Sequence, residues 1–395
     1  MIVTPDKIAG AAARLTGEGA FVVLGRAREI EAQGHDVVHL EIGEPDFDTP
    51  AHIKAAGIAA IEANHSHYAP SAGLPELRDV VARYAGRFRG IAEFTRDEVS
   101  ISPGCKPLIW NILCALLDPG DEMLYADPAY PAYASAALYL GARAVPIRLR
   151  EASDFRLDLD ELAAKISDRT KLLVLNSPHN PTGGVLTRAD LETIAALCVR
   201  HDVLVLSDEI YSRNIYGSEF VSIATMPGMR ERTIIVDGFS KAYAMTGWRL
   251  GYAVAPAALS RTITLLANNT YSCTAPFVQL AGIAALEGPD EPILAMVAEF
   301  RKRRDAIVAG LNSLPGVSCR APEGAFYVFP NFSEITPDDK KLAAYLLDEA
   351  HVAGLGGSAF GPTGRGHMRF SYATSLAHIE RAIERIRVAL PRFTA

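Results

Sequence analysis

Five reactive side chains stand in three polar motifs, each of which directly follows an apolar segment. The first motif holds Asn180, the second Asp208 and Tyr211, and the third Lys241 and Arg249. If the apolar segments are neighbouring parallel strands, the motifs meet at the carboxyl-terminal edge of one sheet, where such sheets bind ligands. An amine condenses with an aldehyde and a guanidinium pairs with phosphate oxygens, so the set suits a ligand carrying both groups.

The elements that must position these motifs alternate between apolar strands and helices. Strands are expected at 99–102, 122–126, 144–147, 171–176, 203–207, 233–237 and 250–254, with helices at 107–117, 132–140, 159–166 and 187–201. Repeated strand–helix units with apolar strands predict an α/β fold, in which helices cover both faces of a mostly parallel central sheet.

The pattern differs at both ends of the chain. A short helix and linker are expected over the first 40 residues; long helices over 279–311, a hairpin-like segment over 317–329 and a helix over 376–390 follow the sheet region. We therefore expect a large domain over residues 45–285 and a smaller α+β domain built from both chain ends, residues 1–44 and 286–395.

Composition limits what the protein can bind and where it works. The 395 residues carry a formal net charge of −7, which argues against nucleic acid as a partner, because such binding depends on Lys and Arg. The five cysteines are widely spaced and no H-E-x-x-H motif occurs, so neither a disulfide framework nor a metal site is expected. Without a signal peptide or a long apolar run, a cytoplasmic protein with no membrane contact is predicted.

The third motif is the most specific one. The segment 238–251, with Lys241 eight positions before Arg249, is similar to the signature of fold-type I, class I/II aminotransferases that depend on pyridoxal 5′-phosphate. Asn180-Pro181-Thr182-Gly183 and Asp208-Glu209-Ile210-Tyr211 stand at matching separations. The chain thus resembles an aspartate/aromatic aminotransferase over nearly its whole length.

This resemblance implies catalytic roles for three residues. Lys241 is the expected Schiff-base lysine, and once released it moves a proton between the substrate Cα and the cofactor C4′. Asp208 is expected to keep the pyridine nitrogen protonated, and Tyr211 and Asn180 to hydrogen-bond the ring 3-oxygen. The implied reaction moves the amino group of an L-amino acid to a 2-oxo acid, by a ping-pong mechanism through a lysine internal aldimine.

The resemblance also implies how the cofactor phosphate and ring are held. Arg249 and Ser240 are expected to contact the phosphate, although Gly238 stands where some members of the family carry a serine. A helix that begins near Pro107 is expected to present the backbone of Gly104, Cys105 and Lys106 to the same phosphate. Tyr130 occupies the position of an aromatic residue that stacks on the ring and is often Trp.

Substrate and subunit contacts follow in the same way. The resemblance implies that Arg369 clamps the substrate α-carboxylate, with Asn180 and the backbone of Gly43 beside it. Tyr68 resembles a tyrosine that reaches the phosphate of a neighbouring subunit, which implies a homodimer with shared active sites. Lys106 is either an exposed charge or a contact for an acidic substrate side chain. Acidic, aromatic, basic and specialised amino acids all remain open.

Other functions share parts of this pattern. A C–S β-lyase or a cyclising synthase of the same fold needs the same lysine, aspartate and arginine, so these residues do not separate the three. A transcription regulator would need a DNA-binding domain, and only 42 residues without a helix-turn-helix pattern precede Gly43. A nicotinamide dehydrogenase is disfavoured because no G-x-G-x-x-G motif follows a strand.

Overall fold

The computed structural model describes residues 7–92, 94–217 and 219–394. Its largest element is an eight-stranded sheet in the order β2-β9-β8-β7-β6-β3-β4-β5, in which only β9 and β5 run against the other strands. The strands are β2 Val99–Ser102, β3 Glu122–Asp127, β4 Arg143–Arg150, β5 Arg156–Leu157, β6 Thr170–Asn176, β7 Leu204–Asp208, β8 Thr233–Gly238 and β9 Gly251–Val254. The predicted α/β fold with a mostly parallel sheet is confirmed.

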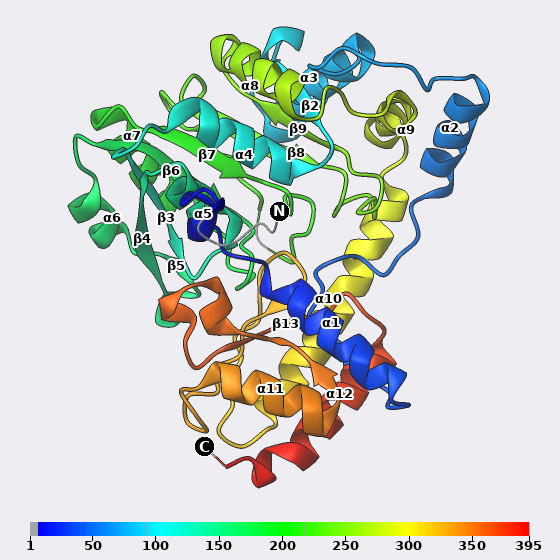
Figure 1. Cartoon of the computed structure of the whole chain (residues 1–395), viewed down its shortest axis with the longest axis vertical. Helices are drawn as coiled ribbons and strands as arrows, with labels where there is room; N and C mark the ends of the chain where they lie inside the picture. The colour runs from blue at the N-terminus through cyan, green and yellow to red at the C-terminus, as the bar shows by residue number, and fades with distance from the viewer. Residues whose placement is uncertain (1–6, 93, 218, 395) are drawn as a thin grey trace.

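Helices cover this sheet on both faces (Figure 1). Successive residues of a strand point to opposite faces, and β6 shows this directly. Leu172 and Val174 pack with the helices α4 (Cys105–Leu116), α5 (Ala132–Tyr139) and α8 (Ala257–Thr270). Leu173 and Leu175 pack with α6 (Leu159–Lys165) and α7 (Arg188–Arg200) on the other face. Because both faces are covered, the strands are continuous apolar runs rather than alternating ones.

The start of α4 differs from the prediction. Pro107 was expected at the first helical position, but it is the third, because the helix begins at Cys105 after Gly104. Gly104 has a φ of 95°, a conformation that glycine adopts at little cost and that turns the chain into the helix early. A proline at the third position is tolerated, since the first four N–H groups of a helix have no helical partner.

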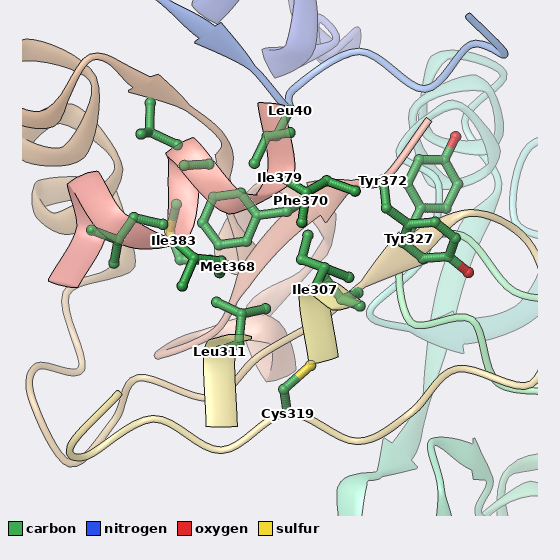
Figure 2. Packing of buried hydrophobic residues seen from close by; sticks show 14 of the residues in the cluster. Leu40, Ile307, Leu311, Cys319, Tyr327, Met368, Phe370, Tyr372, Ile379 and Ile383 are labelled. Carbon is green, nitrogen blue, oxygen red and sulfur yellow. The ribbon is translucent and has the colours of Figure 1, made fainter. Parts of the chain in front are cut away.

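The two ends of the chain form the second region of the molecule. Strand β1 (Val38–His39) pairs in parallel with β11 (Val352–Ala353), and β13 (Met368–Ser371) lies between β10 (Tyr327–Val328) and β12 (Leu355–Gly356). The region's helices are α1 Gly19–Ala32, α10 Glu291–Asn312, α11 Asp339–Ala350 and α12 Leu376–Ala389. Figure 2 shows its core, a cluster that contains Leu40 from the N-terminal segment together with Phe370 and Ile383.

The boundaries in this region were less predictable. The long helix expected over 279–311 is two helices, α9 (Pro276–Glu287) and α10. The hairpin-like segment expected over 317–329 has isolated antiparallel bridges from Ser318 to Asn331 and from Gly324 to Ile215, and its end pairs with β13 instead. The remaining helices are α2 Ala51–Glu62 and α3 Pro75–Arg89, which pack with α9 at the β2 edge of the sheet. In the described ranges no helix has the length and apolar character needed to cross a membrane.

Candidate active site

A cavity of about 940 Å³ lies at the carboxyl-terminal ends of the sheet strands and is closed by segments from both chain ends. Eleven of the residues singled out from the sequence line it: Gly43, Cys105, Lys106, Tyr130, Asn180, Asp208, Tyr211, Ser240, Lys241, Arg249 and Arg369. Gly104 directly precedes this lining at the start of α4. Tyr68 is not brought to the cavity, and 92% of its surface is exposed.

Lys241 follows β8, and its amine reaches across the cavity to the N-terminal segment. The Nζ atom donates a hydrogen bond of 2.6 Å to the backbone oxygen of Gly43. Desolvation in the cavity, together with the positive charges of Arg369 and Arg249, lowers the pKa of Lys241 to about 8. A larger fraction of the amine is therefore unprotonated near neutral pH, which suits a nucleophile or a base.

Asp208 ends β7 and is 5% exposed. Its carboxylate accepts hydrogen bonds from the Tyr133 hydroxyl at 2.6 Å and from the Ile210 backbone N–H at 3.2 Å. Burial raises the pKa of Asp208 to about 6, while the Tyr133 hydrogen bond opposes this rise. Sequence reasoning missed Tyr133. It lies on α5, and no motif in the sequence marked it as a partner of Asp208.

Arg369 comes from β13 and enters the cavity opposite the sheet. Its guanidinium donates to Asn180 Oδ1 at 3.2 Å and to the backbone oxygen of Glu41, and it lies 4.6 Å from the centre of the Tyr327 ring. The Nε atom is buried without a hydrogen-bond partner among the described residues. A buried donor of this kind has a strong need for an acceptor, and a carboxylate ligand supplies one.

Tyr327 is a second residue that sequence reasoning missed. Its hydroxyl and that of Tyr211 are 2.8 Å apart, so the two phenols form one buried pair. The ring also faces Gly43, where an added Cβ would collide with the Tyr327 hydroxyl. Glycine at position 43 thus lets the N-terminal segment approach close enough for its backbone oxygen to meet Lys241.

The start of α4 forms a cationic corner of the cavity. The first N–H groups of a helix and its dipole attract anions. The Arg249 guanidinium lies so close to Gly104 that an added Cβ there would collide with it. Arg249 itself has a φ of 56°, which is uncommon outside glycine and directs its side chain here. The Cys105 thiol donates to the backbone oxygen of Asp237 at 3.3 Å.

The outer end of the cavity holds a separate charged cluster. Glu18, the residue before α1, forms an ion pair with Lys106 and accepts a 2.5 Å hydrogen bond from the Tyr130 hydroxyl. The Lys106 amine also lies 5.9 Å from the centre of the Tyr130 ring. No motif pointed to Glu18, because it stands in a segment far from the other residues and is placed only by the fold.

Comparison with known proteins gives the family. The model of the aminotransferase class I and II family matches residues 35–386. The chain belongs to this family. An aspartate aminotransferase of Geobacillus stearothermophilus is 39% identical over 389 residues, which are 96% of this chain and 98% of that protein.

Solved structures of aminotransferases are equally similar. The aspartate aminotransferase of Thermus thermophilus with maleate gives a TM-score of 0.93 at 36% identity, over 97% of this chain and 99% of that one. The aromatic aminotransferase of Pyrococcus horikoshii gives 0.88 at 39% identity, over 93% and 99%. This aminotransferase therefore has the fold-type I architecture and depends on pyridoxal 5′-phosphate, as predicted.

The cavity contains the groups that this cofactor requires. When bound, pyridoxal 5′-phosphate supplies an aldehyde and an electron-withdrawing ring that stabilises negative charge at the substrate Cα. The Lys241 amine and the Asp208 carboxylate line the same cavity, and the Arg249 corner at the start of α4 suits a phosphate. The cofactor and the residues present are consistent with each other.

Proposed function

We propose that this aminotransferase moves the α-amino group of an L-amino acid to a 2-oxo acid with Lys241 as the proton-transferring base. The supporting observation is that the Lys241 amine shares one cavity with the Asp208 carboxylate and the Arg369 guanidinium. A lowered pKa of about 8 suits a group that takes a proton from the substrate Cα and returns it elsewhere. Lys241 would also be the residue that binds the cofactor covalently.

The other residues of the cavity would hold and orient the cofactor and the substrate. Asp208 would pair with the ring nitrogen, and Tyr133 would fix the position of its carboxylate. Arg369, with its unpaired Nε, would bind the substrate α-carboxylate beside Asn180 and the Gly43 backbone. Such a clamp holds the Cα near the base, which is where positioning lowers the barrier most.

The phosphate and ring contacts form a second set of proposed roles. Arg249, Ser240 and the backbone of residues 104–106 would bind the phosphate, and Tyr211 would donate to the ring 3-oxygen. Tyr130 would pack against the ring. The support is their position in the lining of one cavity, next to a helix N-terminus that attracts anions.

The decisive test follows the absorbance of the bound cofactor in half-reactions with single amino acids. We expect stoichiometric 2-oxo acid and the aminated cofactor from wild-type enzyme. Lys241→Ala is expected to slow this conversion on the order of 10³-fold or more, while Lys302→Ala, at an exposed position on α10, leaves it unchanged. Turnover by Lys241→Ala at the native rate would refute the mechanism. Ammonia and pyruvate from cystathionine would instead indicate a C–S β-lyase.

Assembly, domain division and location are further parts of the proposal. A homodimer is supported by exposed apolar side chains, with exposed fractions of 64% at Phe21, 73% at Val22 and 92% at Tyr68. Sedimentation equilibrium tests this proposal by measuring the mass of the protein in solution. A division into residues 45–285 and the two chain ends is supported by their largely separate apolar cores. A cytoplasmic location is supported by the free thiols of all five cysteines.

A further inference from the structure

The cluster at the outer end of the cavity differs from a simple cationic pocket. Glu18 Oε1 is the shared acceptor for the Lys106 amine and the Tyr130 hydroxyl. The Glu18 side chain is 24% exposed and that of Lys106 is 52% exposed, so both remain accessible from the cavity. Both interactions fall on one carboxylate oxygen, which leaves Oε2 of Glu18 available as an acceptor within the described part of the chain.

This pairing changes what Lys106 offers to a substrate. A free lysine at the outer end would attract a side-chain carboxylate. With Glu18 in contact, the local charge of the pair is zero, and an approaching carboxylate meets a negative group at the distance where Coulomb repulsion is strongest. An acidic side chain would have to displace Glu18 from both Lys106 and Tyr130 before Lys106 could bind it.

The wall between the two ends of the cavity is apolar. Ala20, Phe21 and Leu24 from the α1 segment, with Ile42 and Ile109, line the cavity beside Glu18. An apolar wall suits the methylene groups of a side chain whose α-carboxylate is held by Arg369. The polar end of the substrate side chain then has to pair with Glu18 at the outer end, because burying an unpaired polar group is costly.

Three of the other carboxylate-bearing groups near the outer wall already have partners. His39 contacts Glu31 at 3.1 Å and Glu41 at 2.7 Å, and the Glu44 carboxylate accepts from Thr246 at 2.9 Å. Arg28 also lines the cavity, so it is a second cation that an acidic side chain could meet. Glu18 is thus the acceptor that Lys106 and Tyr130 already hold in a fixed position.

We propose that Glu18 is the specificity residue of this aminotransferase and selects amino donors whose side chain ends in a hydrogen-bond donor over those that end in a carboxylate. The inference rests on the proposed function. It assigns Lys106 the task of positioning Glu18, in place of the direct contact with an acidic side chain that its sequence position had suggested.

Isosteric substrate pairs test this selection. Glutamine and glutamate, or asparagine and aspartate, differ only in whether the side chain ends in a donor or a carboxylate. We expect the wild-type half-reaction to favour the amide of each pair by about tenfold or more in kcat/KM. Glu18→Gln keeps the shape and removes the charge, so the ratio is expected to fall at least tenfold, mainly through KM.

Two controls separate selection from damage. Glu29→Gln removes an exposed carboxylate on the same helix, paired with Arg26, and is expected to leave the ratio unchanged. Alanine, which does not reach the outer end, is expected to react alike in all three proteins. A binding measurement adds a readout other than turnover: calorimetry with glutaramate and glutarate, which lack an amino group, is expected to show the same preference and the same loss in Glu18→Gln.

The outcomes distinguish this inference from the proposed function. A wild-type preference for glutamate, or a substrate ratio that Glu18→Gln does not change, would overturn the role of Glu18 while alanine still converts the cofactor. If no amino acid converts the cofactor, the proposed function itself fails. A loss of cofactor conversion with alanine in Glu18→Gln would show that the residue is structural and would also overturn the selection.

Discussion

The inner and outer ends of the cavity are built in different ways. Asp208 and Arg369 at the inner end are 5% and 4% exposed and come from strands, while Glu18 and Lys106 at the outer end are partly exposed and stand at helix starts. Buried groups on rigid strands have strongly shifted pKa values and fixed positions. Exposed ion pairs contribute little stability, so their identity is free to change with the substrate. The cavity thus combines a fixed chemical end with an adjustable recognition end.

The largest effect is expected from Asp208→Asn at the inner end. Loss of the charge that faces the cofactor is expected to slow the half-reaction on the order of 10³-fold. Burial raises the pKa of Asp208 to about 6, so the ionised carboxylate opposes folding. The stability that the protonated carboxyl gives the folded protein at low pH is therefore lost as pH rises through 6. The cofactor-free variant should therefore be more stable than wild type at pH 8, by about 3 kcal/mol, with a smaller difference at pH 4.

Thermal unfolding of both cofactor-free proteins across this pH range measures the second effect. An Asp208→Asn variant that unfolds at the wild-type temperature at pH 8, or that reacts within tenfold of wild type, would contradict the contrast between the two ends.

Tyr133→Phe should have an intermediate effect, because it removes only the hydrogen bond to Asp208. The Tyr133 hydroxyl lowers the pKa of Asp208, so its loss raises that pKa and moves the acid limb of the pH–rate profile to higher pH. Cofactor affinity, measured by equilibrium dialysis, should fall about tenfold. Tyr139→Phe on the same helix is the matched control, since its ring packs against Trp110 away from Asp208. An unchanged acid limb in Tyr133→Phe would argue that Asp208 needs no positioning.

The smallest effect is expected at the outer wall, from His39→Gln. The hydrogen bonds that His39 donates to the Glu41 and Glu31 carboxylates raise the pKa of His39 to about 9, so the stability from these pairs is complete below pH 6.5 and is lost as pH rises through 9. Allowing for solvent screening, the free energy of unfolding of wild type should fall by about 1 kcal/mol more than that of the variant between pH 6.5 and 9.5. Urea unfolding at the two pH values measures this, with exposed His65→Gln as the control. Parallel pH dependences of wild type and His39→Gln would show that the pair is not stabilising.

The inner end could be read from the sequence because chemistry dictates its residue types. An amine, a carboxylate and a guanidinium after successive apolar strands suit few kinds of site apart from a cofactor pocket, and parallel strands bring their ends together without further information. The α/β alternation that places Lys241 and Asp208 at those ends was equally visible. The antiparallel direction of β9 was not, because strand direction depends on connections and not on apolar pattern.

The outer end could not be read in this way. Glu18 gains its partners only when the segment before α1 reaches the start of α4, and local sequence does not specify a contact between segments so far apart. At the inner end, Tyr133 was missed because it resembled an ordinary buried aromatic residue, and only the fold shows its contact with Asp208. Helix α8 was not expected, because its threonines and asparagines have weak helix propensity, and its stability comes from packing on α4.

The pairing of β1 with β11 sets an order of events during synthesis. Val38 meets Val352, and the Leu40 carbonyl accepts from the Ser371 N–H, so these partners of the N-terminal segment are made only when almost the whole chain has left the ribosome. The strands of the large sheet, which end at Val254, can pair long before that point. A nascent chain would therefore carry the Lys241 amine on a folded sheet while its substrate-selecting wall is still unformed. The Arg369 side of the cavity is completed equally late, because β13 is among the last elements to be made.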